Sequence, residues 1–320
     1  MQRPSIAVLG ASGYTGVELV RLLARHPGVE LAVAGSERWV GKRVEATELR
    51  YSTPEQALEE AMRCTAVLCA TPAEVSHALV PRLVERAIVI DLSGAFRLRD
   101  ASAYPRHYGF EHRHPELLAR AVYAVTEHHR ERVKGARLIA NPGCYATAIQ
   151  LALAPLVGSA TDFVVDAVSG VTGAGRKATE EMSFAEIAGD VRAYRTLRHQ
   201  HAPEIELALG APVVFVPHLV PIARGILATC HARLTGDVTF ERYANEPFVE
   251  VADSADAVAI HDVVGTNRCK LGYTIVGDRI VVTAAIDNLV KGAAGQAVQN
   301  LNVALGLPET TGLDLRSFHP

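Results

Sequence analysis

The chain has 320 residues, of which 49% are hydrophobic and 21% are charged, and its formal net charge is −3 at pH 7. A chain of this length usually forms two domains, and this composition excludes disordered and fibrous proteins. Basic and acidic residues are scattered and nearly balanced, which argues against partners such as nucleic acid or an anionic membrane, and no apolar stretch is long enough to span a bilayer.

The elements predicted for the first half alternate between strand and helix. Residues 5–10 form a short apolar run that ends in glycine, and apolar residues follow at helical spacing over 14–26. The same reasoning predicts strands over 30–36, 64–71 and 87–92 and a helix over 73–86. This alternation is typical of an α/β fold with a doubly wound parallel sheet.

The second half has a different pattern. Residues 225–234 alternate apolar and polar side chains, as a strand does when one of its faces meets solvent, and residues 279–287 also predict a strand. We therefore expect an α+β domain with a mixed or antiparallel sheet. The predicted domains are residues 1–143, completed by a C-terminal helical segment over 289–320, and residues 144–288.

Export and metal binding are not expected. Residues 1–10 lack the basic region, long apolar stretch and cleavage site of a signal peptide. The five cysteines form no CxxC pair, so neither a disulfide framework nor a zinc site is predicted, and we expect reduced thiols in the cytoplasm. They are Cys64, Cys69, Cys144, Cys230 and Cys269.

A glycine-rich turn joins the first predicted strand to the first predicted helix. Glycines at such a turn let the backbone approach a pyrophosphate, whose charge the helix amides then meet, so a dinucleotide site is favoured over an empty turn. The residues expected to contact the dinucleotide are Gly10, Ser12, Gly13, Tyr14, Thr15 and Gly16.

The end of the second predicted strand bears on the choice of dinucleotide. It reads Gly35-Ser36-Glu37-Arg38, where a lone acidic residue would indicate NAD. Ser36 and Arg38 are suited to the 2′-phosphate of NADP, whereas Glu37 is suited to the free ribose hydroxyls of NAD. The residues favour NADP and leave NAD as the alternative.

Cys144 lies where a predicted strand turns into a helix, in Asn141-Pro142-Gly143-Cys144. A helix start lowers the pKa of a thiol, and its amides can stabilise an oxyanion on a bound acyl group. Cys144 is therefore the predicted nucleophile. The other four cysteines are expected to be buried packing residues.

Two histidines and a carboxylate form the candidate acid–base group. His199, His201 and Glu204 lie close together in the sequence, and residues two apart do not share a helical face, so only one histidine is expected to act on the Cys144 chemistry. The spacing leaves open which one. Another set of histidines is expected at the surface rather than around a metal: His107, His112, His114, His128 and His129.

Two further segments are candidate binding elements. Gly173 and Gly175 lie in a small-residue loop that ends in Arg176 and Lys177, a composition suited to an anion. Asn288 precedes a helical pattern over 288–305, where it is either a helix cap or a free amide for a ligand.

Five ordered blocks of the sequence resemble the N-acetyl-γ-glutamyl-phosphate reductases, a family of the aspartate-semialdehyde dehydrogenase superfamily. They are GASGYTG at 10–16, NPGCYAT at 141–147, SGVTGAGRKA at 169–178, VPHLVPIARGI at 216–226 and DNLVKGAAGQAVQNLN at 287–302. The resemblance implies a Rossmann domain followed by a catalytic α+β domain that forms a homo-oligomer, either a dimer or a tetramer. It also implies NADPH-dependent reduction of N-acetyl-L-glutamyl 5-phosphate to the semialdehyde and phosphate, in arginine biosynthesis.

The resemblance assigns roles to individual residues. Cys144 matches the family nucleophile and His199 the favoured acid–base group, with His201 and Glu204 orienting or binding the substrate. It implies that Arg97 and Lys177 contact the substrate anion. Asn288, together with Gly173 and Gly175, is expected at the cofactor.

The chain departs from the family pattern at two places. Residues 71–74 read Thr-Pro-Ala-Glu where a Pro-His-Gly turn is expected, and Gly94-Ala95 replaces Ala-Asp. Two alternative functions stay open: a reductase of carrier-protein-linked aminoadipyl phosphate in lysine biosynthesis, which shares most of these blocks, and a non-catalytic dinucleotide-binding redox sensor.

Overall fold

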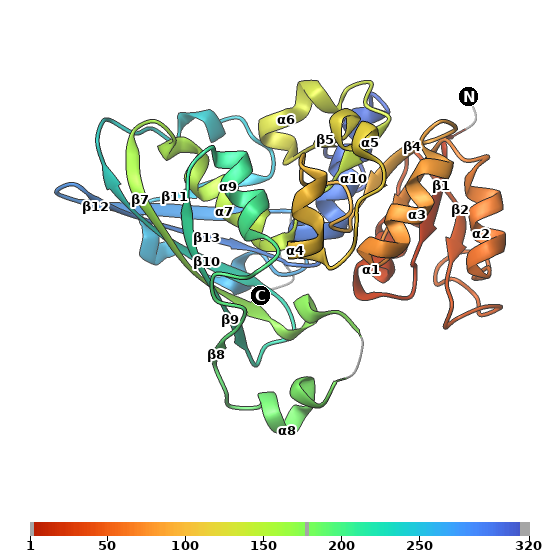
Figure 1. Cartoon of the computed structure of the whole chain (residues 1–320), viewed down its shortest axis with the longest axis horizontal. Helices are drawn as coiled ribbons and strands as arrows, with labels where there is room; N and C mark the ends of the chain where they lie inside the picture. Colours follow the sequence, from red (N-terminus) through yellow and green to blue (C-terminus); the bar gives the residue numbers. More distant parts are fainter. Residues whose placement is uncertain (1–2, 177–178, 314–320) are drawn as a thin grey trace. The chain divides into compact units, whose positions relative to one another are not determined.

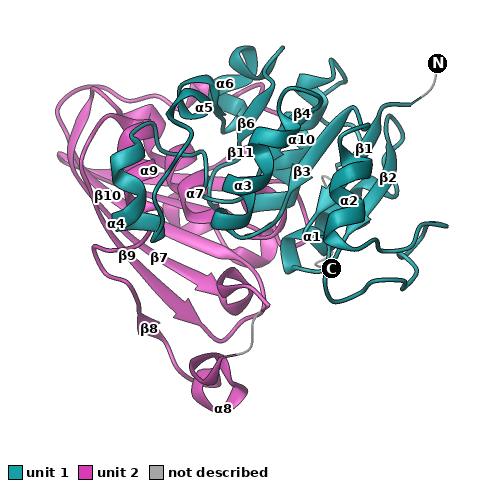
Figure 2. Ribbon diagram, turned by 45° about the vertical axis from the view of Figure 1, so that its right-hand side comes forward, with its two compact units in different colours: residues 1–143, 293–314 teal, residues 144–292, 315–320 magenta. Residues whose placement is uncertain are grey.

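The computed structural model describes residues 3–176 and 179–313. They form two compact units, shown in different colours in Figure 2. Unit 1 takes its residues from Met1–Gly143 and Ala293–Asp314, and unit 2 from Cys144–Gly292. Each unit is built around one β-sheet.

The sheet of unit 1 has six strands in the order β2-β1-β3-β4-β6-β5, and all neighbouring strands are parallel. Figure 1 labels β1, β2, β4 and β5 of this sheet. Its central strands are short and buried except at Ser5 and Ile88, as expected of a sheet covered on both faces. The strands are β1 (Ser5–Leu9), β2 (Glu30–Gly35), β3 (Ala66–Cys69), β4 (Ile88–Asp91), β5 (Val122–Tyr123) and β6 (Leu138–Ala140).

Most helices of unit 1 lie in the connections between these strands. Helix α2 was not predicted from the sequence; its start is fixed by Thr53, whose side chain accepts a hydrogen bond from Gln56 N in a capping box. The helices are α1 (Tyr14–Leu23), α2 (Pro54–Ala61), α3 (Ala73–Leu83), α4 (Tyr104–Tyr108), α5 (Pro115–Arg120), α6 (Thr126–Val133) and α10 (Gly295–Ala304).

Helix α10 comes from the end of the chain and packs against α1 and α6. Its buried side chains include amides, which hold the carboxyl edge of the sheet. Asn300 Nδ2 donates to Ala124 O at 3.1 Å and to Asn141 Oδ1 at 3.2 Å, while Asn300 Oδ1 accepts from Thr126 Oγ1 at 2.7 Å. The turn that leads toward Gly143 is thereby fixed from α10.

The sheet of unit 2 is mixed and has seven strands in the order β11-β12-β13-β10-β7-β9-β8. The pairs β11–β12 and β7–β9 are parallel, and the other pairs are antiparallel. The strands are β7 (Ala160–Gly170), β8 (Arg192–Ala193), β9 (Val213–Val220), β10 (Ile226–Leu234), β11 (Val249–Ala252), β12 (Cys269–Val276) and β13 (Arg279–Ile286).

Three helices belong to unit 2: α7 (Cys144–Leu153), α8 (Phe184–Ile187) and α9 (Ala202–Leu209). Helix α7 packs against β10, β13 and α9, and every one of its residues after Cys144 is buried. This all-round burial explains why the helix carries no charged residue.

The structure confirms the predicted fold class, a doubly wound parallel sheet together with an α+β unit on a mixed sheet. The buried and exposed sides of β10 also alternate as expected. The helix predicted over 288–305 begins instead with a π-helical turn, Val290–Ala294, before α10. Within the described ranges, no helix is both long and apolar enough to cross a membrane.

Candidate active site

The glycine-rich turn of unit 1 connects β1 to α1 and depends on two glycines for its shape. Gly10 has a φ of +80°, and a Cβ atom at this position would lie 2.5 Å from Ala70 O. A Cβ atom at Gly16 would lie 2.2 Å from Gly10 O. A larger residue at either position is therefore incompatible with the turn.

Gly13 has a different role, because it is the N-cap residue of α1 and a Cβ atom there would meet only Gly10 O, at an ordinary 3.6 Å. No described side chain caps α1, and its first turn contains no acidic residue. Ser12 is buried, while Tyr14 and Thr15 are partly exposed. An open glycine face at an uncapped helix start fits the pyrophosphate of a dinucleotide.

The turn after β2 is organised by Ser36, which is 2% exposed. Its Oγ accepts hydrogen bonds from Arg38 N at 3.2 Å and from Trp39 N at 3.0 Å. The side chains of Glu37 and Arg38 are both exposed. Ser36 thus shapes the turn, and the exposed cation available to a 2′-phosphate is that of Arg38.

Arg97 is buried in unit 1 at 6% exposure. Its Nε donates to Asn141 O at 2.8 Å, and its Nη2 donates to Leu92 O at 2.9 Å. The guanidinium therefore joins the segments that follow β4 and β6. That Arg97 also contacts a substrate anion stays a prediction, and Lys177, its predicted companion, lies outside the described residues.

Cys144 is the first residue of α7 in unit 2 and is partly exposed. The four other cysteines are buried, and burial raises the pKa of Cys64, Cys69 and Cys230. Cys144 is therefore the thiol most accessible to an electrophile, and it lies where helix amides stabilise negative charge.

Aromatic residues link the start of α7 to the candidate histidines. The ring of Tyr145 lies 5.4 Å from that of His199 and 6.1 Å from that of His201, measured between centroids. The Tyr194 hydroxyl donates to the Tyr145 hydroxyl at 3.1 Å, and the Tyr145 hydroxyl donates to His218 O at 3.3 Å. The tertiary structure thus brings the residue after Cys144 next to both histidines.

His199 is buried, and its Nδ1 accepts a hydrogen bond from His201 N at 3.1 Å, which places the proton of the neutral ring on Nε2. Burial, assisted by the positive charge of Arg195, lowers the pKa of His199 to about 4. The imidazole is therefore neutral near pH 7, the form in which it can accept a proton.

His201 and Glu204 form a pair at the start of α9. His201 Nε2 lies 3.6 Å from Glu204 Oε1, and both side chains are buried. A buried carboxylate beside an imidazole orients the ring. The two histidines therefore differ in their surroundings: the positive charge of Arg195 lowers the pKa of His199, and Glu204 lies beside His201.

The turn before His199 has an unusual backbone. Arg195 and Leu197 have φ values of +47° and +57°, a region that non-glycine residues rarely occupy. Such conformations persist where the surrounding structure imposes them, and they are common at functional sites. Nothing in the local sequence indicates this strained turn, and sequence analysis missed it.

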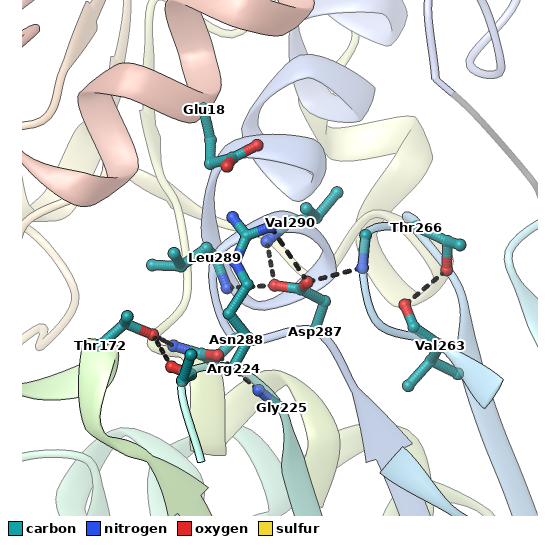
Figure 3. Close-up of polar contacts among 12 residues, drawn as sticks. Glu18, Thr172, Arg224, Gly225, Val263, Thr266, Asp287, Asn288, Leu289 and Val290 are labelled. Carbon is teal, nitrogen blue, oxygen red and sulfur yellow. Dashed lines mark hydrogen bonds and ion pairs between the residues drawn. The ribbon is translucent and has the colours of Figure 1, made fainter. Parts of the chain in front are cut away.

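Asn288 lies between two loops of unit 2, at Thr172 and at Gly225 (Figure 3). Asn288 Oδ1 accepts from Gly225 N at 2.8 Å, and its Nδ2 donates to Thr172 Oγ1 at 3.0 Å. A Cβ atom at Gly173 would lie 3.0 Å from Ser169 Oγ, and Gly175 has a φ of +84°. The amide of Asn288 is thus already bonded to two loops of its own unit.

One histidine expectation was wrong. His112 is buried, not at the surface; its Nε2 donates to Ala95 O at 2.9 Å and its Nδ1 accepts from His114 N. Burial lowers its pKa to about 4. His112 is therefore a structural residue, and the carbonyl that it contacts belongs to one of the positions where the chain departs from its family pattern.

Two family models match the chain. Residues 5–136 match the semialdehyde dehydrogenase NAD-binding domain, and residues 144–288 match the semialdehyde dehydrogenase dimerisation domain. Solved structures show the same fold: the chain aligns with aspartate semialdehyde dehydrogenase II from Vibrio cholerae at a TM-score of 0.75 and 20% identity, covering 95% of this chain and 98% of that one.

Curated relatives are closer in sequence. The chain is 44% identical to N-acetyl-γ-glutamyl-phosphate reductase of Laribacter hongkongensis, over 98% of this chain and 99% of that protein. It is 45% identical to the reductase of the same name from Ectopseudomonas mendocina, again over 98% and 99% of the two chains. The chain therefore belongs to the N-acetyl-γ-glutamyl-phosphate reductase family of semialdehyde dehydrogenases.

Proposed function

We propose that the chain reduces N-acetyl-L-glutamyl 5-phosphate to N-acetyl-L-glutamate 5-semialdehyde and phosphate, with NADPH as the reductant, in arginine biosynthesis. The single observation that carries this proposal is the position of Cys144, a partly exposed thiol at the start of α7 in a chain whose other cysteines are buried. The names of the curated relatives support the glutamyl substrate over the aminoadipyl one and an enzyme over a sensor.

The proposed NADPH contacts of unit 1 are the backbone of the turn over 10–16 together with Ser36 and Arg38. Those proposed for unit 2 are Gly173, Gly175 and Asn288. When bound, NADPH supplies the hydride that reduces a thioester carbonyl to the aldehyde level.

The thiolate of Cys144 is the proposed nucleophile. It adds to the acyl carbon of the substrate, and the tetrahedral intermediate expels phosphate to leave a thioester on Sγ. The amides at the start of α7 are suited to the negative charge on the carbonyl oxygen during this step. After reduction, the carbon–sulfur bond breaks and the Cys144 thiolate is regenerated.

His199 is the proposed acid–base group. To take the proton of the Cys144 thiol before the attack, the imidazole must release the hydrogen bond that His201 N donates to its Nδ1. The resulting imidazolium returns that proton to the Cys144 thiolate as the aldehyde leaves. The low pKa of His199, about 4, makes the imidazolium a strong acid once it has formed. His201, held by Glu204, is the proposed anchor of the substrate, with Arg97 and Lys177 as further contacts for its anionic groups.

The same proposal includes self-association and a cytoplasmic location. The match of residues 144–288 to a dimerisation domain supports a homo-oligomer, a dimer or a tetramer, formed through unit 2.

The reverse reaction tests the proposed function. The protein is mixed with NADP, inorganic phosphate and N-acetyl-L-glutamate 5-semialdehyde, and the absorbance of reduced nicotinamide is followed. A rise that requires all three components is expected. A rise with the aminoadipyl semialdehyde alone would favour the lysine-route reductase, and no rise with either substrate would favour the sensor.

A further inference from the structure

The π-helical turn Val290–Ala294 follows directly from β13 and begins with a wide hydrogen bond. Gly292 N donates to Asp287 O at 2.9 Å, five residues back in the chain. A π-turn is less stable than the α-helix that these residues could otherwise form, and such turns are frequent at functional sites. The presence of a π-turn here therefore indicates that it holds one of its residues in a position that an α-helix would not give.

What it places nearby is Cys144. A Cβ atom at Gly292 would lie 2.7 Å from Cys144 Cβ, 3.1 Å from Cys144 Cα and 3.2 Å from Ile286 Cδ1. Cβ atoms do not approach other carbon atoms as closely as 2.7 Å. The side of Gly292 that carries only a hydrogen atom therefore contacts the backbone and Cβ of Cys144, the proposed nucleophile.

Asp287 holds the start of this turn. Its Oδ1 accepts from Leu289 N at 2.8 Å and from Val290 N at 3.1 Å, and its Oδ2 accepts from Gly265 N at 2.7 Å (Figure 3). The carboxylate is fully buried, and Arg224 Nη1 lies 3.7 Å from Oδ2. A charged cap with three amide donors fixes the backbone from which Gly292 projects.

Asn288 fixes the next residue of the turn. Its side-chain amide bonds Gly225 N and Thr172 Oγ1, and the Thr172 hydroxyl in turn donates to Ala223 O at 2.6 Å. The start of the turn is thus bonded at Asp287 and Asn288 to three separate loops of unit 2. This network makes the position of Gly292 rigid.

We propose that Gly292 is a positioning residue for Cys144. The π-turn, capped by Asp287, holds Gly292 in contact with Cys144, the first residue of α7, and this contact sets the position of the thiol. The proposal rests on the proposed function of Cys144. Gly292 itself has no side chain with which to take part in the chemistry.

The substitution Gly292→Ala tests the proposal because its effect on an ordinary helix is known. Glycine-to-alanine substitutions normally stabilise a helix. Here the added methyl group must displace Cys144, and displacement of a reacting group by several tenths of an ångström to 1 Å lowers a rate by about 10- to 100-fold. We expect that loss in kcat, with the KM for NADPH unchanged.

Alkylation by iodoacetamide measures the thiol independently of substrate. Since the other four cysteines are buried, one modification per chain is expected, and the Cys144→Ala variant provides the blank. The second-order rate of alkylation should fall in Gly292→Ala at unchanged thermal stability. Gly236→Ala is the matched control, because a Cβ atom there meets Ser159 Oγ at an ordinary 3.6 Å in an exposed bend.

A double variant separates positioning from crowding. Ile286→Val removes the Cδ1 atom that the alanine would also meet, so full recovery of kcat and alkylation in Gly292→Ala/Ile286→Val, relative to Ile286→Val alone, would overturn the proposal. Wild-type rates in Gly292→Ala would do the same. Should Gly292→Ala not fold, Asp287→Asn loosens the cap without adding atoms beside Cys144, and the proposal then requires slower alkylation in that variant.

The two readouts keep this inference distinct from the proposed function. If the wild-type protein fails to reduce the acyl phosphate while Gly292→Ala still slows alkylation, the function is wrong and the positioning role stands. If the wild-type protein is active and neither rate changes in Gly292→Ala, the function stands and the positioning role is wrong.

Discussion

The glycine-rich turn of unit 1 and the thiol site of unit 2 both rely on close approach to a glycine, but they are assembled differently. The turn over 10–16 is one continuous segment; Gly16 approaches Gly10 within it, and a distant segment that it approaches closely is the start of the 70–71 turn, at Gly10. In the thiol site, Cys144 contacts Gly292 and the ring of Tyr145 lies near that of His199. The two members of each pair are far apart in the sequence.

This difference teaches which kind of site a sequence reveals. A local turn that binds through backbone amides has its requirements written in one short motif. A site assembled by a mixed sheet has its requirements spread over several loops, and only the topology of the sheet brings those loops together.

The thiol site depends on one nucleophile. Cys144→Ala should lower kcat by at least about 10⁴-fold, as loss of a nucleophile does in other covalent mechanisms. The Kd for NADPH, measured by fluorescence titration, should change little, since the glycine-rich turn is untouched. Near-normal turnover in this variant would rule out the thioester mechanism.

The two histidines should be separable by kinetics. His199→Asn should lower kcat by about 10²- to 10⁴-fold with a modest change in KM, because a general acid–base group acts in the transition state. His201→Asn should mainly raise the KM for the acyl phosphate, since an anchor stabilises ground and transition states alike.

The pH profile of the wild-type enzyme sharpens this assignment. Burial lowers the pKa of His199 to about 4, so in the free enzyme its neutral form persists as the pH falls through the usual histidine range near 6.5. The acid limb of kcat/KM that is due to His199 should therefore have its midpoint well below 6.5. Reversed phenotypes of the two variants would make His201 the acid–base group, and two near-wild-type variants would remove both from the chemistry.

The glycines of unit 1 should separate folding from binding. Gly13 has φ −69° and ψ 165°, which any residue can adopt, and a methyl group there meets only Gly10 O, at an ordinary 3.6 Å. The Gly13→Ala variant should fold normally, but its Kd for NADPH should rise by about 10- to 100-fold, which corresponds to the loss of hydrogen bonds to a charged group. Gly10→Ala should instead lower the melting temperature. Equal NADPH affinity in wild type and Gly13→Ala would mean that the dinucleotide does not approach this turn.

Arg38 should give the smallest of these effects and the most selective one. Arg38→Ala is expected to raise the Kd for NADPH by about tenfold, the lower end of the range for loss of a charged hydrogen bond. The Kd for NADH should change little. Arg43→Ala is the matched control, because Arg43 is an exposed arginine of the same segment that pairs with Glu48. Equal weakening of both cofactors would place the 2′-phosphate elsewhere and direct attention to Glu37.

Much of the fold could be predicted from the sequence because its signals are local. The apolar runs and helical spacing of the first half identified β1, α1, β2, β3, α3 and β4, with differences of a few residues at their ends. The π-turn before α10 could not be predicted, since a π-turn and an α-helix have the same apolar pattern and differ in a backbone hydrogen bond, here from Gly292 N to Asp287 O. The predicted domain boundaries, at residues 143 and 288, stay a prediction.

The candidate site was predictable to a smaller extent. Cys144 had a local signal at the start of a helix, and the structure places it there. The difference between His199 and His201 depends on Arg195 and Glu204, whose effects follow from burial and from the strained turn, which no spacing rule reports. The roles of the individual site residues stay predictions.

Direct observation of the acyl-enzyme tests the central claim. The protein is mixed with N-acetyl-L-glutamyl 5-phosphate in the absence of NADPH, quenched in acid, and its intact mass and peptides are measured. We expect one N-acetylglutamyl group per chain, located on Cys144, stoichiometric release of phosphate, and loss of the adduct on addition of NADPH. An active enzyme that shows no adduct, or an adduct on another residue, would contradict a thioester at Cys144.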